Sequence, residues 1–205
     1  MNWNVTRSIY VLGISVLMSG VICSAQTKKT EKSSKQTVEL KTFKPSVVKA
    51  PRFSVSVSAD RPSTELASEF LELRAEYSNR AEWLDELTFT YYLMLESRDA
   101  KATAGQQYSL WKGSVTYEDI EKGSRLASTM FLSPAKLKRY GKYKAIRVEI
   151  TYQGQEIEAK TLPETPNPWW SAQEPKGRLL KRSETPFALI DSTYYPDIKD
   201  ESSAR

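Results

Sequence analysis

The sequence predicts an all-β fold, a sandwich of about 8–9 strands with one short helical turn. Apolar and polar residues alternate with a period of two over most of the chain after residue 50, and this is the period of half-buried strands. Only one short segment carries a clear helix signal. The chain has 205 residues, of which 40% are hydrophobic, so it can bury one core of ordinary size but not two.

The predicted strands follow one another along the chain. They are residues 53–57, 71–77, 87–95, 108–117, 126–132, 146–152, 157–159 and 187–190. Gly113 lacks a side chain in the middle of its run, which suggests a β-bulge. Residues 117–123 fit a turn that ends at a glycine, and residues 153–155 predict a hairpin turn. Residues 61–71 fit either a short helix or a loop, and we prefer a loop or a single turn.

The helix signal lies between two strong strands. Ser133 can cap the helix, Pro134 suits its first turn, and Gly141 can end it in a left-handed conformation. A single turn that carries the chain from one sheet to the other resembles the corner between strands E and F of immunoglobulin-like sandwiches. The patterns Leu132-Ser-Pro134 and Tyr143-x-x-Ile-x-Val-x-Ile are similar to fibronectin type III sequences. The resemblance implies an immunoglobulin-like or fibronectin III-like β-sandwich.

The first 25 residues are typical of a signal peptide. Arg7 precedes an apolar run over residues 9–23, and small residues follow it, so cleavage is expected after Ala25. An uncleaved anchor is the alternative, although the run is short for a membrane span. Lipid attachment at Cys23 is disfavoured because the bulky Ile22 precedes it. We therefore expect an exported protein, located in the periplasm, on the outer-membrane surface or outside the cell.

The remaining chain divides into three parts by composition. Residues 26–49 form a basic segment that we expect to be flexible, residues 50–196 form the sandwich, and residues 197–205 form a disordered C-terminus. The net charge of +5 comes from the basic segment, because residues 53–205 are slightly acidic. The segment could touch an anionic surface or glycan, or serve as a solvated spacer. We expect no nucleic-acid partner, because the domain itself is not basic.

Several chemistries are excluded by residue types. The chain has no histidine and one cysteine, so Ser-His-Asp and Cys-His catalysis, His/Cys zinc sites and an internal disulfide cannot be built. No phosphate-binding glycine pattern is present. The acidic clusters at residues 82–86 and 118–121 fit solvated strand ends better than a glycosidase pair or a calcium site. We expect no enzyme activity, catalytic residue, cofactor or metal.

Aromatic residues supply the candidate contact surface. Trp169 and Trp170 are adjacent in a proline-rich segment, and we expect one of the two indoles to be exposed, as a contact surface or as a shield over the end of the sandwich. Tyr92 should share the outer face of its strand with Met94, covered either by another subunit or by a loop of the same chain. Trp83 and Trp111 fit core positions. The candidate contact residues are Trp169, Trp170, Tyr92, Met94, Tyr194 and Tyr195.

The combination of export signal, basic segment, a sandwich without cysteine or histidine, and the long strand around residues 83–92 resembles a family of verrucomicrobial secreted proteins. That family has an immunoglobulin-like fold and is associated with type IV pilus genes. The resemblance implies a non-enzymatic cell-surface or pilus-associated protein that acts through protein-protein contacts, with pilus or outer-membrane proteins as partners and possible self-association. The alternative function is a carbohydrate-binding or mucin-adhesive module that uses exposed aromatic side chains.

Overall fold

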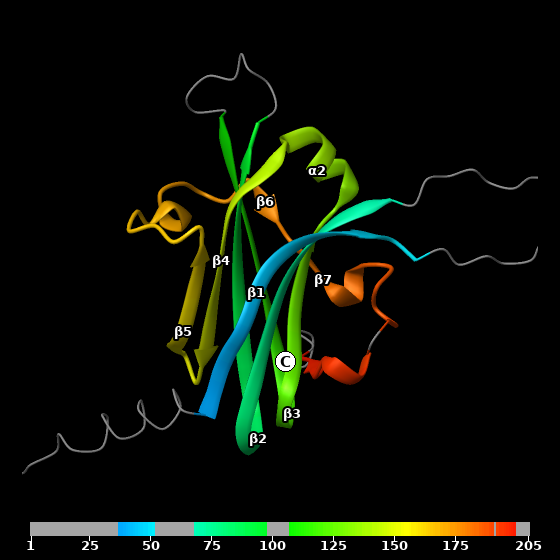
Figure 1. Cartoon of the computed structure of the whole chain (residues 1–205), viewed down its shortest axis with the longest axis vertical. Coiled ribbons are helices and arrows are strands. Elements are labelled where there is room, and N and C mark those ends of the chain that lie inside the picture. The colour runs from blue at the N-terminus through cyan, green and yellow to red at the C-terminus, as the bar shows by residue number, and fades with distance from the viewer. Residues whose placement is uncertain (1–36, 52–67, 98–106, 191, 200–205) are drawn as a thin grey trace, which may run out of the picture.

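The structure, a computed structural model, describes residues 37–51, 68–97, 107–190 and 192–199. Eight strands form one sheet in the order β5-β4-β2-β3-β6, with β1 paired to β2 and with β7 and β8 paired to β3 (Figure 1). The strands are β1 (Val38–Lys49), β2 (Glu69–Glu96), β3 (Tyr108–Leu132), β4 (Lys142–Tyr152), β5 (Gln155–Leu162), β6 (Gly177–Arg178), β7 (Leu180–Lys181) and β8 (Asp197–Ile198). The helical elements are α2 (Pro134–Tyr140) and the 3-10 turns η1 (Trp169–Ser171), η2 (Arg182–Glu184) and η3 (Ser192–Tyr194).

The two longest strands bend together, so that one sheet supplies both layers of the sandwich. β2 and β3 pair over residues 71–77 and again over residues 83–96 of β2, with register shifts between the two stretches. Rings from the two halves then meet in the core. The Tyr77 and Phe89 ring centroids are 4.9 Å apart, and those of Phe43 on β1 and Tyr91 are 6.0 Å apart. Figure 1 shows the bend at the lower end of the molecule.

Asn79 holds the bend. Its side chain is 2% exposed, and its Nδ2 donates hydrogen bonds to the carbonyl oxygens of Ile120 (3.1 Å) and Glu121 (3.2 Å) on β3. Its Oδ1 accepts one from the Ala81 amide at 2.9 Å. These bonds replace ladder bonds that are lost where the register shifts, because buried backbone groups need partners. Asp119, with φ of 50°, provides the matching distortion in β3.

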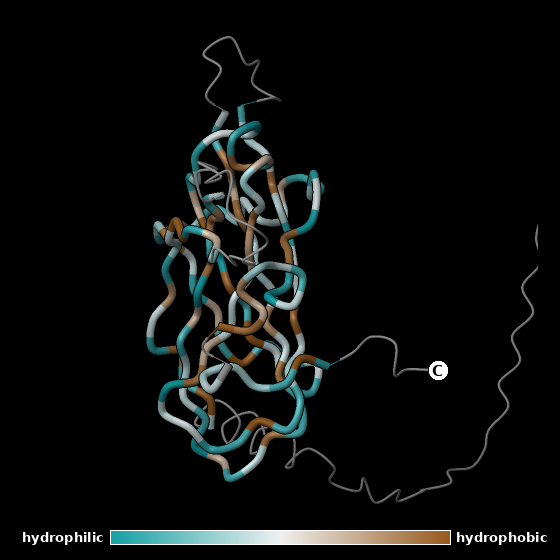
Figure 2. Tube along the Cα trace, turned by 90° about the vertical axis from the view of Figure 1, so that its right-hand side faces the viewer, coloured by the Kyte–Doolittle hydropathy of each residue, from teal (hydrophilic) through white to brown (hydrophobic). Residues whose placement is uncertain are grey.

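The alternating pattern predicts correctly which side chains face the core, but it predicts the wrong strand boundaries. The core contains the predicted inward positions of β2, among them Leu73, Ala75, Leu87 and Leu93, all fully buried. The runs at residues 71–77 and 87–95 are two halves of one strand, whereas they were expected as separate strands. Residues 117–123, expected as a turn, lie inside β3 at its bend. Figure 2 shows hydrophobic and hydrophilic stretches following one another along the same strands.

The predicted corner and hairpin are confirmed. α2 begins after Ser133 with Pro134 in its first turn, and Gly141, with φ of 108°, follows its end. It joins the second half of β3 to β4, which pairs with the second half of β2, so it carries the chain from one layer to the other. Gln153 and Gly154 have φ of 49° and 77°, as in the type I′ turns that favour tight hairpins.

Four further predictions of local structure are wrong. Residues 38–49, placed in the flexible basic segment, form β1, whose Val38 and Phe43 are buried in the core. Residues 197–198 form β8 and are not a disordered end. Gly113 lies in a regular register opposite Tyr91, without a bulge. Residues 187–190 form turns instead of a strand. The predictions for residues 1–25, 53–57 and 61–67 lie outside the described residues.

Gly113 is explained by close packing. A Cβ at this position would lie 2.4 Å from Met130 Cε and 2.8 Å from Leu179 Cβ, so the missing side chain lets the segment before β7 lie against the sheet.

The all-β sandwich is therefore confirmed. An immunoglobulin domain has two separate sheets, whereas one folded sheet supplies both layers here. The immunoglobulin-like connectivity stays a prediction. Among the described residues, no helix has the length and apolar character needed to cross a membrane.

Candidate functional site

Four of the six predicted contact residues lie together on the outer face of one layer. Trp169 in η1 is 7% exposed and packs with Leu110 and Ala145, and Tyr92, Met94 and Trp170 pack against this cluster. The two indoles meet edge to face, with centroids 5.8 Å apart. The proline-rich segment thus covers the face of β2 that carries Tyr92. Of the two expected covers, another subunit or the chain itself, the structure shows the chain itself.

Arg147 on β4 closes the exposed side of this cluster. Its guanidinium lies 4.0 Å from the centroid of the Trp170 ring, donates a hydrogen bond to Glu149 at 2.8 Å and another to Thr161 at 3.0 Å. A guanidinium stacked on an indole and held by a carboxylate is fixed in orientation. One face of Trp170 is therefore occupied, and the expected exposed indole is not found, since Trp169 is buried and Trp170 half-buried.

Tyr92 links the same cluster to Glu149. Its hydroxyl donates a hydrogen bond to the Glu149 carboxylate at 3.1 Å, and burial, with the charge of Glu149, raises the pKa of Tyr92 to about 12. The phenol therefore stays neutral over the physiological pH range. The arrangement fixes the segment before β6 onto the sheet. The Tyr92 hydroxyl and the Arg147 guanidinium are hydrogen-bonded within the cluster, whereas the buried Trp169 Nε1 has no hydrogen-bond partner among the described residues.

We expect Arg147→Met to cost about 2 kcal/mol of stability, because it removes the stack on Trp170 and leaves Glu149, a mostly buried carboxylate, without its cation. The Arg147 and Glu149 side chains are 13% and 18% exposed. Urea unfolding measures the change. The matched control is Arg178→Met, because Arg178 is 66% exposed in its ion pair with Glu184 and should cost less than about 1 kcal/mol. Equal losses in the two variants would contradict the prediction.

The other two predicted contact residues lie elsewhere. Tyr195 lies between two arginines, with Arg182 Cζ 3.8 Å and Arg74 Cζ 5.8 Å from its ring centroid, and its hydroxyl accepts a hydrogen bond from Arg74 at 3.2 Å. Burial raises the pKa of Tyr195. Tyr194 is 43% exposed. Tyr195 thus links the C-terminal segment to Arg74 on β2, and neither tyrosine joins the Trp169 cluster.

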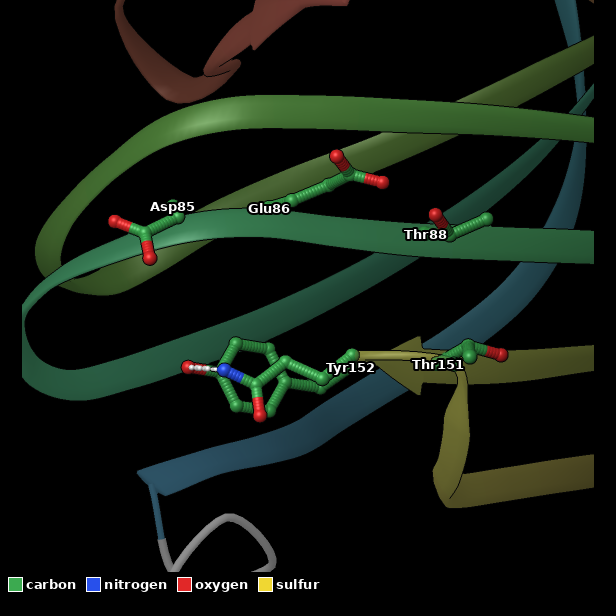
Figure 3. A pocket seen from close by; sticks show the side chains of 7 residues that line it. Asp85, Glu86, Thr88, Thr151 and Tyr152 are labelled. Atoms are coloured by element: carbon green, nitrogen blue, oxygen red, sulfur yellow. Dashed lines mark hydrogen bonds between the residues drawn. The ribbon is translucent and has the colours of Figure 1, made fainter.

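Two open pockets are lined in part by residues of the acidic clusters at 82–86 and 118–121. The first, of about 360 Å³, is shown in Figure 3 and lies between β2 and the β4–β5 hairpin; it is lined by Asp85, Glu86, Thr88, Thr151, Tyr152, Gln153 and Gly154. The second, of about 380 Å³, is lined by Trp83, Asp119, Glu121, Leu126, Thr193, Tyr195, Pro196 and Asp197. In the described ranges, no three His, Cys, Asp or Glu side chains come together as metal ligands.

Sequence reasoning missed two features of the surface. Trp83, expected in the core, is 56% exposed and lines the second pocket, whereas Trp111 is buried as predicted. The second feature is a group of cations on and around α2. A local signal for it exists, since residues 132–148 contain six Lys or Arg and no Asp or Glu. The net charge of the whole domain does not reveal this group, because acidic residues elsewhere offset it.

Comparison with known proteins identifies relatives of the chain. One protein-family model matches residues 29–202. The fold is similar to that of a protein from Akkermansia muciniphila known from its crystal structure, with a TM-score of 0.64, 19% sequence identity, and coverage of 80% of this chain and 93% of that chain. No curated protein matches. At this identity the structural match shows a shared fold, and it confirms the predicted likeness to a verrucomicrobial protein at that level.

Proposed function

The chain belongs to the family whose model matches residues 29–202, and from this premise we propose that it is an exported, non-enzymatic protein of the cell surface that acts through protein-protein contacts. The partners that we propose are components of a pilus or of the outer membrane, or a second copy of the chain. The leader-like first 25 residues and the fold shared with a verrucomicrobial protein support this proposal. The observation that carries it is the free edge of β1.

β1 offers an open edge for strand addition. In the described part of the chain, β1 pairs only with β2, and its other edge carries unpaired backbone groups. Pro45 lies within β1, as is usual for edge strands. Val47 on the same strand is 56% exposed, which is high for a valine. An unpaired edge with an exposed apolar side chain can accept an extended segment of another chain.

The hydrogen bonds show which backbone groups of β1 face away from β2. The Ala50 amide donates to the Ser68 carbonyl, so the antiparallel alternation directs the backbone groups of Lys49, Val47 and Pro45 away from β2. The absence of an amide hydrogen in Pro45 agrees with this assignment, since no ladder bond is lost there. Further along, the Leu40 amide also points away and donates to Glu158 on β5 at 2.8 Å. The free edge therefore runs from Phe43 to Lys49.

We expect Val47→Pro to weaken association with a partner or second copy by at least about fivefold while leaving the fold intact. Proline at this position removes the Val47 amide hydrogen, which faces away from β2, and the branched apolar side chain. It removes no hydrogen bond to β2. Val48→Pro is the matched control, because the Val48 amide faces β2 and its loss should destabilise the domain itself. Light-scattering mass across a concentration series, with a thermal melt of each variant, measures both effects.

Three results would contradict the proposal. The chain could remain a monomer and capture no pilus or outer-membrane protein from its own cells. It could associate equally well with and without the Val47→Pro substitution. Finally, a hydrolytic activity that disappears on changing one carboxylate would show an enzyme instead.

Carbohydrate binding is the second candidate function, and exposed Trp83 favours it. Its indole lines the second pocket beside the carboxylates of Asp119 and Glu121, and such groups suit stacking on a sugar ring and hydrogen bonding to its hydroxyls. Binding of mucin glycans that is lost in Trp83→Ala but retained in Trp170→Ala would support this function. Binding that depends on neither residue would exclude both aromatic sites.

A further inference from the structure

One end of the molecule, formed by α2 and the segments beside it, carries five cations without a partner carboxylate. Lys136, Lys138 and Arg139 lie on α2, Lys142 begins β4, and Lys176 directly precedes β6. None of the five has a carboxylate within 4 Å in the described part of the chain. We call these five residues the basic end. α2, which carries three of the five, lies near the upper end of the molecule in Figure 1.

Aromatic rings hold three of these cations in place. The rings of Trp111 and Tyr140 are 5.1 Å apart and form the centre of the group. Lys136 Nζ lies 4.9 Å from the Trp111 centroid, and Lys176 Nζ and Arg139 Cζ lie 4.8 and 5.2 Å from the Tyr140 centroid. A ring orients a cation but does not neutralise it as a carboxylate would. The positive charge is therefore positioned and still available to an anion.

The opposite end of the molecule, at the bend of β2 and β3, is rich in acidic residues. Glu82, Asp85, Asp119 and Glu121 are all exposed there. Lys122 and Arg125 offset them only in part. An anionic surface would attract the end with α2 and repel the end with the bend, so the charge pattern also sets an orientation.

An exposed aromatic side chain lies within the basic end. Tyr143 is 51% exposed and falls between Lys142 and Lys144 in the sequence. Tyrosine is enriched where protein meets lipid headgroups, because its ring is apolar and its hydroxyl polar. Cations on three separate segments around such a ring suit a surface that presents many phosphates side by side.

We propose that the basic end docks on the anionic phospholipids of a membrane surface, with α2 against the headgroups and the bend of β2 and β3 directed away. This function goes beyond the protein contacts proposed above and uses a different surface from the β1 edge. Each cation near such a surface contributes about a fivefold increase in binding. Three of them should contribute about a hundredfold, and the effect should weaken with salt.

The test uses the chain as the cell produces it and vesicles of phosphatidylcholine with phosphatidylglycerol. The triple variant Lys138→Gln, Arg139→Gln, Lys142→Gln is expected to lose about a hundredfold in cosedimentation with these vesicles. The matched control is Lys44→Gln, Lys122→Gln, Arg125→Gln, which removes the same charge from exposed positions away from α2. This control variant should lose less than about fivefold in binding to the same vesicles. Vesicles of phosphatidylcholine alone give the baseline for binding that does not depend on lipid charge.

Each other outcome would overturn the proposal. Equal losses in the two triple variants would mean that net charge, and not the basic end, controls binding. No loss in either would assign binding to the lysine-rich residues before β1. Binding of the basic end to single-stranded DNA without binding to the vesicles would replace lipid with nucleic acid. Two controls accompany the test. Equal thermal melts of the two triple variants exclude misfolding, and the charge-conserving variant Lys138→Arg, Lys142→Arg should bind as the wild type does.

Discussion

Raising the pH above 10 is expected to unfold the protein cooperatively, because the core contains three buried tyrosines whose hydroxyls resist ionisation. Burial raises the pKa of Tyr77 and Tyr91 well above 10 and that of Tyr117 to about 12. In the unfolded chain each ionises near pH 10. The unfolded state therefore loses protons first as the pH rises, so stability is complete below pH 10 and falls above it.

The expected loss is large. Each buried tyrosine contributes about 1.4 kcal/mol per pH unit between its unfolded and folded pKa, so the three together remove about 4 kcal/mol per unit. A domain with 5–15 kcal/mol of stability should unfold near about pH 12. Circular dichroism and phenolate absorbance, recorded on the same samples, measure the transition. The loss of β-structure should coincide with the ionisation of the last tyrosines.

Tyr91→Phe gives the control for this transition. The Tyr91 hydroxyl is buried and has no hydrogen-bond partner among the described residues, so its removal should change stability little at neutral pH. The alkaline transition should move to higher pH and become less steep, because one of three protons no longer contributes. Full ionisation of all tyrosines near pH 10 with native circular dichroism would contradict the explanation.

The alternating strands could be predicted because the signal is local. Side chains of a strand alternate between its two faces, so Phe89 and Tyr91 are assigned to the core from their spacing alone. The corner at α2 could be predicted as well, because its signals, Ser133 and Pro134 at the start and Gly141 at the end, lie within one short segment. These elements depend on neighbours in sequence and not on the rest of the fold.

The bend could not be predicted because a polar break looks the same in a loop and in a bent strand. Ser78 and Asn79 interrupt the apolar pattern, yet both are buried. Asn79 bonds to the carbonyl oxygens of Ile120 and Glu121 on β3, which are 41 and 42 residues further along the chain. β1 was misread for a similar reason. The lysine-rich residues before it and its own three lysines make the segment basic, whereas its burial depends on Val38, Leu40 and Phe43 packing beside β2.

The surface aromatics were the least predictable part of the candidate site. Whether a tryptophan is exposed depends on what covers it, and the cover comes from distant segments. Arg147 covers Trp170, whereas Trp83 at the bend remains exposed. The basic end, in contrast, had a local signal that a charge count over the whole domain averaged away.

Asn79→Leu is expected to destabilise the protein by about 3–5 kcal/mol, since it leaves the Ala81 amide and the carbonyls of Ile120 and Glu121 without their partner in a buried place. The side chain is similar in size, so packing changes little while the hydrogen bonds are lost. Urea unfolding measures the cost. Asn167→Leu is the matched control, because Asn167 is exposed and its side chain carries none of these bonds, so its effect should stay within about 0.5 kcal/mol.

Asn79→Asp separates the hydrogen bonds from the shape of the side chain. An ionised carboxylate can still accept from Ala81, but it cannot donate to Ile120 and Glu121, and its charge would face two carbonyl oxygens. Burial and this repulsion would raise its pKa above that of the unfolded chain, so the variant should gain stability relative to wild type as the pH falls. A constant difference at all pH values, or equal stability of Asn79→Leu and wild type, would show that the bend is held by packing rather than by Asn79.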